Sequence, residues 1–400
     1  MRAALLASVA AALLAGPAFA QSEATAHTQT QLRGTYSGLT LRVGQTDDVG
    51  ATAVAGGNAV SRSGDNANVT LTSVQHMESD ANAQADAQIE NAGNVSIYSA
   101  SVGNGATASA VNGNVDADTT QFDHGDTLAE TRVETGDAAS AASSASAGAN
   151  VAALSAENGD IRGNVTQEST GDVTANTEAG HGGVWGQVVA DAIASANNVS
   201  AAGSTTTMLT NTNQNSAGAH ATASVDLYAD HAQDAVANAS ANANSNTIDN
   251  AFGYANVTAR QQASTDVRAD SYVTLGQSFD GFASASAYGV GNSTVASNIA
   301  SDTALNVEQT NEGATDANAA LSGGGGDQAL ASSAAYGNVV TGALCTTCDN
   351  SQPTLEANST QVNEGPVTST ATIIASRARQ VAASSSAIGN AATYQVIGAH

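Results

Sequence analysis

Lysine is missing from this sequence, so its 10 basic Lys and Arg positions are all arginine, against 36 aspartates and glutamates in 400 residues. The formal net charge is −26. Such a surface is repelled by nucleic acid and by anionic lipid headgroups, and both are therefore excluded as partners. The same charge favours solubility.

Large apolar side chains are also scarce, because Leu, Ile, Val and Phe together make up about one residue in six. At this level, with high net charge, the usual expectation is disorder. Ala, Ser, Thr, Asn and Gly dominate instead, and each buries little apolar area, which excludes a thick core. Two architectures tolerate such a composition: a disordered chain, or a stack of repeats around a thin core.

The first twenty residues have the pattern of a secretory signal. Arg2 is followed by the apolar stretch Ala3–Leu14, and Ala18-Phe19-Ala20 matches a small-x-small cleavage site before Gln21. Gly16-Pro17 break the apolar run, which is short for a bilayer span of about 20 residues. The sequence therefore predicts export, with residues 1–20 removed.

A repeat of about 46 residues runs along the chain. One recurring element is a run of small residues that ends in Asn, as in Ser99–Asn104 and Ser333–Asn338. Its anchor residues are Asn58, Asn104, Asn150, Asn197, Asn244, Asn292, Asn338 and Asn390. Their spacings are 46, 46, 47, 47, 48, 46 and 52. Self-similarity at a fixed period is the signature of a repeat architecture.

A second element ends in Gln and keeps phase with the first. Its anchors are Gln29, Gln75, Gln121, Gln167, Gln214, Gln261, Gln309 and Gln361. The offset from each Asn to the next Gln is 17 in six of seven repeats and 23 in the seventh, where six residues are inserted. Chance matches in a low-complexity chain would not hold two elements in phase over seven repeats.

The segments around the anchors predict strands. Val69–Val74 alternates in character, and Val225–Leu227 and Tyr272–Leu275 show similar β-branched, period-two patterns. Only three prolines interrupt the chain, which suits continuous strand ladders. Residues 138–153 are rich in alanine and could be helical by propensity. The matching positions of other repeats carry Gly and β-branched residues, so we expect a strand there too.

These features predict an all-β fold, an elongated β-solenoid of about eight repeats of about 46 residues. Stacked Asn and Gln side chains would bond to the amides above and below them. We expect two coils of about 23 residues per repeat, so that some sixteen coils at ~4.8 Å each form a rod of roughly 75 Å. Residues 21–50 are assigned to an N-terminal cap and first half-repeat, and 51–400 to the solenoid with a truncated last repeat. The main alternative to the β-solenoid is an unfolded chain that becomes ordered on assembly.

Few residues in this sequence are candidates for a disulfide, a metal site or a ligand contact. Cys345 and Cys348 are the only cysteines, and in an oxidising compartment we expect a structural loop disulfide. The seven His have no metal-ligand spacing and are interpreted as solvated. Asp116, Asp118, Asp123 and Asp126 could hold Ca²⁺ but lack the glycine-rich pattern of calcium-binding β-rolls. Trp185, the only Trp, is either a sugar-stacking platform or a packed, capping aromatic. We therefore expect no cofactor, no metal and no catalytic residue.

The signal sequence, the two anchors and the acidic, Ala/Asn/Ser/Thr-rich composition together resemble the holdfast anchor protein D family of stalked alphaproteobacteria. Asn306–Gln309 and Gly337-Asn338 are also similar to the Gln/Asn-spaced strands of curlin subunits, although the repeat here is about twice a curlin unit. The family resemblance implies a role at the outer surface of the cell pole or stalk, where the polysaccharide holdfast is attached to the envelope. It also implies two partners, a curlin-like companion and a curli-type outer-membrane secretion lipoprotein.

From this we expect an exported adhesion protein that anchors an exopolysaccharide adhesin to the cell surface. The first alternative is a curlin-like amyloid subunit that self-assembles. A polysaccharide lyase or hydrolase is the second, and it would need acids and arginines clustered in a groove.

Overall fold

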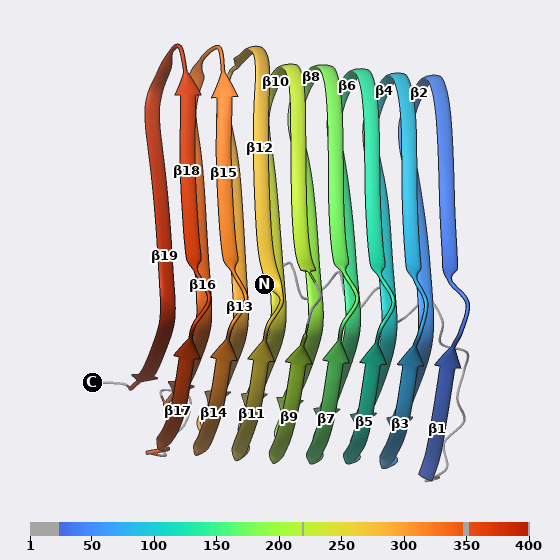
Figure 1. The fold of residues 1–400 in the computed structure, drawn as a ribbon, viewed down its shortest axis with the longest axis vertical. Coiled ribbons are helices and arrows are strands. Elements are labelled where there is room, and N and C mark those ends of the chain that lie inside the picture. The colour runs from blue at the N-terminus through green and yellow to red at the C-terminus, as the bar shows by residue number, and fades with distance from the viewer. Residues whose placement is uncertain (1–23, 218–219, 347–351, 399–400) are drawn as a thin grey trace.

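The structure, a computed structural model, describes residues 24–217, 220–346 and 352–398, and this part of the chain forms parallel strands without a helix (Figure 1). None of these residues therefore belongs to a helix that could cross a membrane. The all-β solenoid prediction is confirmed, including a strand over the alanine-rich residues 138–153. The predicted signal sequence lies outside the described residues.

The strands alternate in burial because every second side chain faces inward. In β3 (Val69–Met77), Val69, Leu71, Ser73 and Gln75 are buried while the residues between them face outward. The short strands are β1 (Ala24–Gln31), β3, β5 (Val115–Asp123), β7 (Ile161–Ser169), β9 (Met208–Ser216), β11 (Ala255–Ala263), β14 (Thr303–Asn311) and β17 (Leu355–Asn363). They form one eight-stranded parallel sheet in that order.

Long strands form the second sheet. They are β2 (Thr35–Asp65), β4 (Ala81–Val111), β6 (Thr127–Glu157), β8 (Val173–Ser204) and β10 (His220–Ala251). In the last three coils each long strand is divided in two, giving β12 (Asp266–Phe279) with β13 (Phe282–Ile299), β15 (Thr315–Gly323) with β16 (Gly326–Cys345), and β18 (Val367–Ala375) with β19 (Ala378–Ile397). Both members of the first pair hydrogen-bond to β10, so each pair continues one long strand.

One repeat makes one coil, and the expectation of two coils per repeat is wrong. Gln75 pairs with Gln121, and Asn104 pairs with Asn150, so neighbouring coils are one whole repeat apart. A coil consists of a short strand, a turn, and a long strand that bends back on itself, in β4 around Glu90–Asn94 (top of Figure 1). At ~4.8 Å per coil, eight coils span roughly 40 Å, and the molecule is longest along its strands rather than along the stack (Figure 1).

The thin core has two compartments. The larger lies between the two arms of the bent long strands and is built largely of alanine, with Ile97 and Val133 among its larger members. The smaller lies between the short strands and the last third of the long strands, where Leu71, Ile161 and Met208 pack. Small inward side chains let two sheets approach closely, which explains how so few large apolar residues suffice.

Residues at one corner of the coil adopt the left-handed conformation. They lie one coil apart, with φ values of 52° to 59°, and are Asn66, Asn112, Asn158, Thr205, Phe252 and Ala300. Asn tolerates this conformation, whereas Thr, Phe and Ala are strained in it. In the first coils the residue at this corner therefore suits the left-handed backbone, and in the later coils the backbone there is strained.

The predicted segment boundaries fall within this continuous stack. Residues 21–50 include β1 and the first part of β2, which pair along their length with β3 and β4. At the other end, β19 continues past Asn390 to Ile397, in register with β16.

Candidate functional site

The sixteen anchor amides lie in two ladders along the stacking axis. Each of the seven steps from Asn58 to Asn390 is a side-chain hydrogen bond of 2.7–2.9 Å. Each of the seven steps from Gln29 to Gln361 is likewise 2.7–2.9 Å. Most of these side chains are fully buried, so the ladders satisfy amides that would otherwise destabilise the core.

All anchor amides except Asn390 also donate to a backbone carbonyl of the opposite sheet and so tie the two sheets together. Asn104 Nδ2 donates to Asn150 Oδ1 at 2.8 Å and across the core to Phe122 O at 2.8 Å. Gln121 Nε2 donates to Gln75 Oε1 at 2.8 Å and across the core to Val151 O at 3.1 Å. The two ladders thus form a polar layer between the two apolar compartments, and they fix the register of the stack.

One aspartate is buried next to this layer. Asp123 is fully buried at the end of β5, where the Gly125 amide (3.3 Å) and the Thr127 hydroxyl (3.3 Å) donate to its carboxylate. Desolvation raises the pKa of Asp123 to about 8. Asp116 and Asp118 lie instead on the exposed side of β5, so the four aspartates singled out as a calcium site do not face one point. Within the described residues no three His, Cys, Asp or Glu side chains are placed to hold a metal.

Histidines are not all solvated, and that expectation is wrong for His181. Its side chain is 3% exposed, neither ring nitrogen has a hydrogen-bond partner among the described residues, and burial lowers its pKa to about 4. His76 stacks on Phe122, and His124 Nδ1 lies 3.2 Å from the Glu78 carboxylate. His400 lies outside the described residues.

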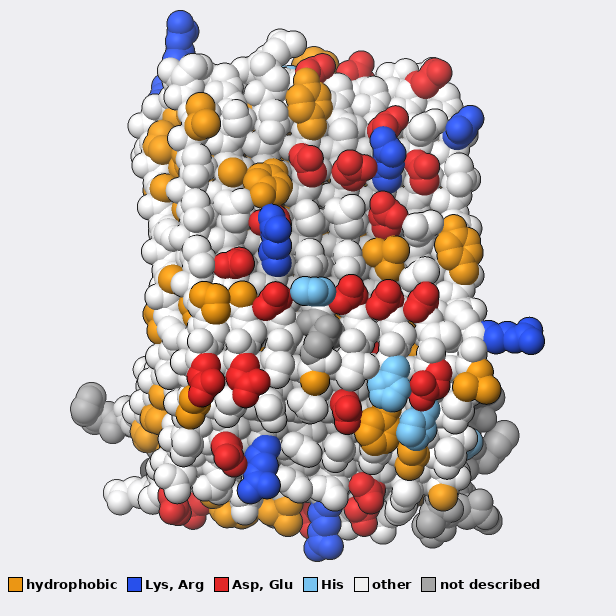
Figure 2. All heavy atoms as spheres, viewed as in Figure 1, with side chains coloured by type: hydrophobic (Ala, Val, Ile, Leu, Met, Phe, Trp, Pro, Cys, Tyr) orange, Lys and Arg blue, Asp and Glu red, His pale blue; other side chains and the backbone are white. Residues whose placement is uncertain are grey.

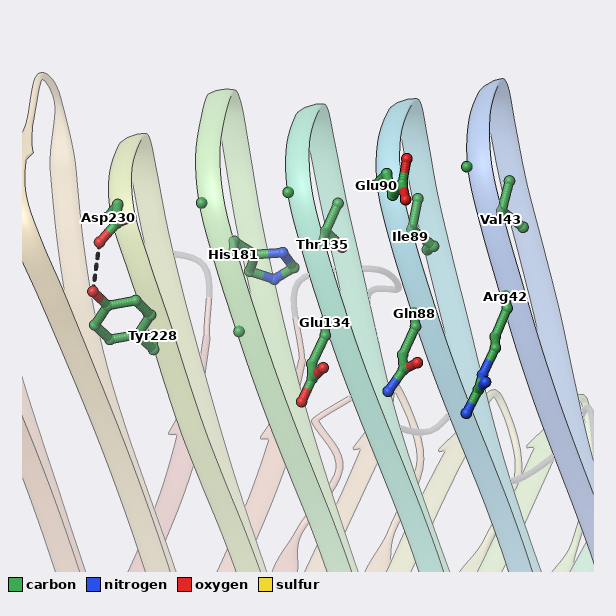
Figure 3. A pocket seen from close by; sticks show the side chains of 14 residues that line it. Arg42, Val43, Gln88, Ile89, Glu90, Glu134, Thr135, His181, Tyr228 and Asp230 are labelled. Carbon is green, nitrogen blue, oxygen red and sulfur yellow. Dashed lines mark hydrogen bonds between the residues drawn. The ribbon is translucent and has the colours of Figure 1, made fainter.

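His181 lines a groove at the bend of the long strands, which we call the bend groove (Figure 3). It crosses five neighbouring strands, β2, β4, β6, β8 and β10, and has a volume of about 680 Å³. Its polar lining consists of Arg42, Gln88, Glu90, Glu134, Thr135, His181, Tyr228 and Asp230, and its hollow is widened by Gly44, Gly136, Gly180 and Gly182. No sequence motif marked it, because its residues are one coil apart and meet only through stacking.

The chain's acidity is distributed in rows on the surface. Figure 2 shows carboxylate side chains crossing the coils, with few basic groups between them. Arg132 lies 3.2 Å from Glu134 and 3.5 Å from Glu178, on the strand face that leads to the bend groove. Such exposed pairs contribute little stability, so these rows act mainly on approaching charged molecules.

Trp185 is not a packed aromatic. Its side chain is 71% exposed, in β8 where the pairing register with β6 and β10 shifts. Its ring centroid lies 6.0 Å from that of His231. This exposed ring, three residues beyond the groove-lining Gly182, suits stacking on a ligand.

A second hollow, of about 910 Å³, combines acids and arginines near the divided strands. Asp280, Asp327, Arg377 and Arg379 line it with Gly324–Gly326. Arg379 Nε lies 3.5 Å from Asp327 Oδ1, and both side chains are more than half exposed. The hollow has the residue types of a lyase site, but its ion pair is open to water rather than held in a dry, preorganised pocket.

The predicted disulfide cannot be placed, because Cys348 lies outside the described residues. Cys345 ends β16, in the repeat whose sequence is six residues longer between its Asn and Gln anchors. The pairing stays a prediction.

The comparisons with known proteins give one match. A family model described as holdfast attachment protein D matches residues 43–315, well over half of the chain. No curated protein and no solved structure matches. The matched region covers the lining of the bend groove except Arg42 and most of both ladders, and the family resemblance inferred from the repeats is confirmed.

Proposed function

Since this chain belongs to the holdfast attachment protein D family, we propose that it is exported and anchors a polysaccharide adhesin to the cell surface without catalysis. The observation that supports the proposal best is the repetition of polar groups in register on the outer strands. On the short-strand sheet, one outward column is formed by Thr72, Asp118, Asn164, Asn211, Thr258, Asn306 and Asn358.

This column offers many weak contacts to one polymer. Asn211 Nδ2 donates to Asn164 Oδ1 at 2.8 Å, so even exposed amides are held in a fixed orientation. A polysaccharide is itself repetitive, and successive hydrogen bonds to its hydroxyls would add by multivalency. A stiff stack keeps these groups aligned without further ordering on binding.

The proposal includes a place and partners. We propose that the protein lies at the outer surface of the envelope, at the cell pole or stalk tip. A curlin-like companion and a curli-type outer-membrane secretion lipoprotein would be its partners, on the basis of the family resemblance.

A deletion strain tests the attachment role. Synthesis of the adhesin is expected to continue while the adhesin is released into the medium, measured by lectin labelling of cells and of the supernatant. Unchanged attachment strength in the deletion strain would contradict the proposal. A purified chain that cleaves the polysaccharide would contradict its non-enzymatic part.

Self-assembly is a second candidate, favoured by the ends of the stack. Among the described strands, β1 and β2 pair on one side only, as do β17, β18 and β19. Edge strands present unpaired backbone groups that template further pairing. The fibre alternative predicts thioflavin-positive polymers from purified protein, whereas a solenoid acting singly stays monomeric in size-exclusion chromatography.

A further inference from the structure

The bend groove has the geometry of a site for an extended, repetitive molecule. It runs across β2, β4, β6, β8 and β10, and each strand contributes residues from the same register positions. Its lining therefore repeats every ~4.8 Å, and five strands span roughly 19 Å. A linear glycan repeats on a similar scale, so successive sugars would meet successive coils.

The charge of the lining selects among glycans. Three carboxylates, from Glu90, Glu134 and Asp230, line the groove, against one base, Arg42, at its first strand (Figure 3). With a net charge of −26 on the whole chain, an anionic glycan is repelled. A glycan that carries ammonium groups is attracted by the carboxylates on β4, β6 and β10.

Two buried polar side chains in the lining lack partners. His181 is 3% exposed and Thr135 is 5% exposed, and they are adjacent in the β6–β8 register. Thr135 Oγ1 and both ring nitrogens of His181 have no hydrogen-bond partner among the described residues. Buried polar groups are normally paired, and a neutral imidazole both donates and accepts. Hydroxyl and amino groups of a bound sugar would complete these bonds.

We propose that the bend groove binds an extended glycan whose sugars carry free amino groups. The inference rests on the proposed attachment function, and it adds to the outward column a second binding site with a defined ligand chemistry. Glu90, Glu134 and Asp230 bind the ammonium groups, and Thr135 and His181 contact the sugar at the centre of the groove.

Three oligosaccharides of equal length separate the possible ligands: β-1,4-linked glucosamine, its fully N-acetylated counterpart, and an oligouronate. Calorimetric titration of the mature protein is expected to show that the glucosamine oligomer binds about tenfold or more tightly than the acetylated one, since several exposed charge pairs are lost on acetylation. High salt should reduce this difference. Equal binding of the acetylated or uronate oligomer, or no binding of any, overturns the ligand chemistry.

Two groove variants, each with a matched control, test the location. Glu90→Gln, Glu134→Gln and Asp230→Asn together remove the groove's carboxylates, and Glu157→Gln, Glu356→Gln and Asp116→Asn make the same charge change at exposed positions outside the groove and outside the outward column. Gly180→Ile fills the groove, because a Cβ at Gly180 meets only the Val133 carbonyl at 3.9 Å, and Gly56→Ile adds the same side chain at an exposed, open position. Circular dichroism checks that each variant folds.

Both groove variants are expected to weaken binding of the glucosamine oligomer about tenfold while both controls retain it. Equal effects of groove and control variants overturn the location. In cells, groove variants that retain the adhesin as the wild type does would overturn this inference and leave the attachment function standing. A deletion strain that retains the adhesin overturns the attachment function itself.

Discussion

Gly103 in β4 packs directly against the carboxylate of Asp123, which lies in β5 of the opposite sheet. A Cβ at Gly103 would collide with Asp123 Oδ2. The next coils have Ala149 at the glycine position and Ser169 at the aspartate position. The same complementarity recurs elsewhere, because Gly57 faces Met77 and Gly291 faces Asn311. Each coil therefore has a larger side chain opposite glycine or a smaller one opposite alanine, which keeps the layer close-packed.

The first prediction concerns this pair. Gly103→Ala should destabilise the protein by roughly 1–3 kcal/mol through overpacking. Asp123→Ser in the same chain should recover most of that loss, because it reproduces the Ala149 and Ser169 combination. Urea unfolding of the two single variants and the double variant measures the coupling. Additive effects would show that the two positions do not compete for the same space.

The second prediction concerns pH. The pKa of Asp123 is raised from 3.8 to about 8 in the folded state, so the folded state binds more protons than the unfolded state between these values. Its contribution to stability is full below pH 4 and is lost as pH rises to about 8, with a slope of up to ~1.4 kcal/mol per pH unit.

Asp123→Asn removes this dependence. The variant should match the wild type near pH 4 and exceed its stability at pH 8, and Asn311 and Asn363 already occupy the matching positions of later coils. The difference between the two urea-unfolding free energies, followed across pH, isolates this group from the other acids. A constant difference would contradict a buried, protonated Asp123.

The third prediction concerns the ladders. Asn150→Leu removes the acceptor of Asn104 Nδ2 and the donors to Asn197 Oδ1 and Glu168 O. Buried groups left unpaired cost about 1–3 kcal/mol each, so a loss of at least ~3 kcal/mol is expected. Asn211→Leu, in the exposed outward column, is the matched control and should cost under ~1 kcal/mol. Thermal unfolding of both variants measures the difference. Equal losses of stability would show that a ladder amide stabilises the protein no more than an exposed one.

The fourth prediction concerns the strained corner. Ala300 adopts a φ of 59°, and Ala300→Gly should stabilise the protein by about 0.5–1 kcal/mol, because glycine reaches this conformation without steric cost. Asn158→Gly, at the same corner with a φ of 55°, should change stability little, since Asn already tolerates it. A shift in melting temperature for Asn158→Gly as large as that for Ala300→Gly would contradict strain as the cause.

The anchor residues show which contacts can be predicted from the sequence. Asn104 and Gln121 are 17 residues apart, and the structure places them in one polar layer, where Asn104 bonds to the carbonyl of Phe122 beside Gln121. A constant offset is visible in the sequence because every coil must satisfy the same contact. The neighbours of His181 and Asp123 cannot be predicted from the sequence, because they come from strands one coil away or across the core.

The sequence by itself determined the strand class, the repeat of about 46 residues and the residues that share a column, since these follow from period and alternation. Only the tertiary structure decided that one repeat closes one coil, because the place where a long strand bends back depends on packing between its two arms. The same bend made the groove and buried His181. Burial and shape arise from contacts between coils, and a linear pattern of residue types does not specify those contacts.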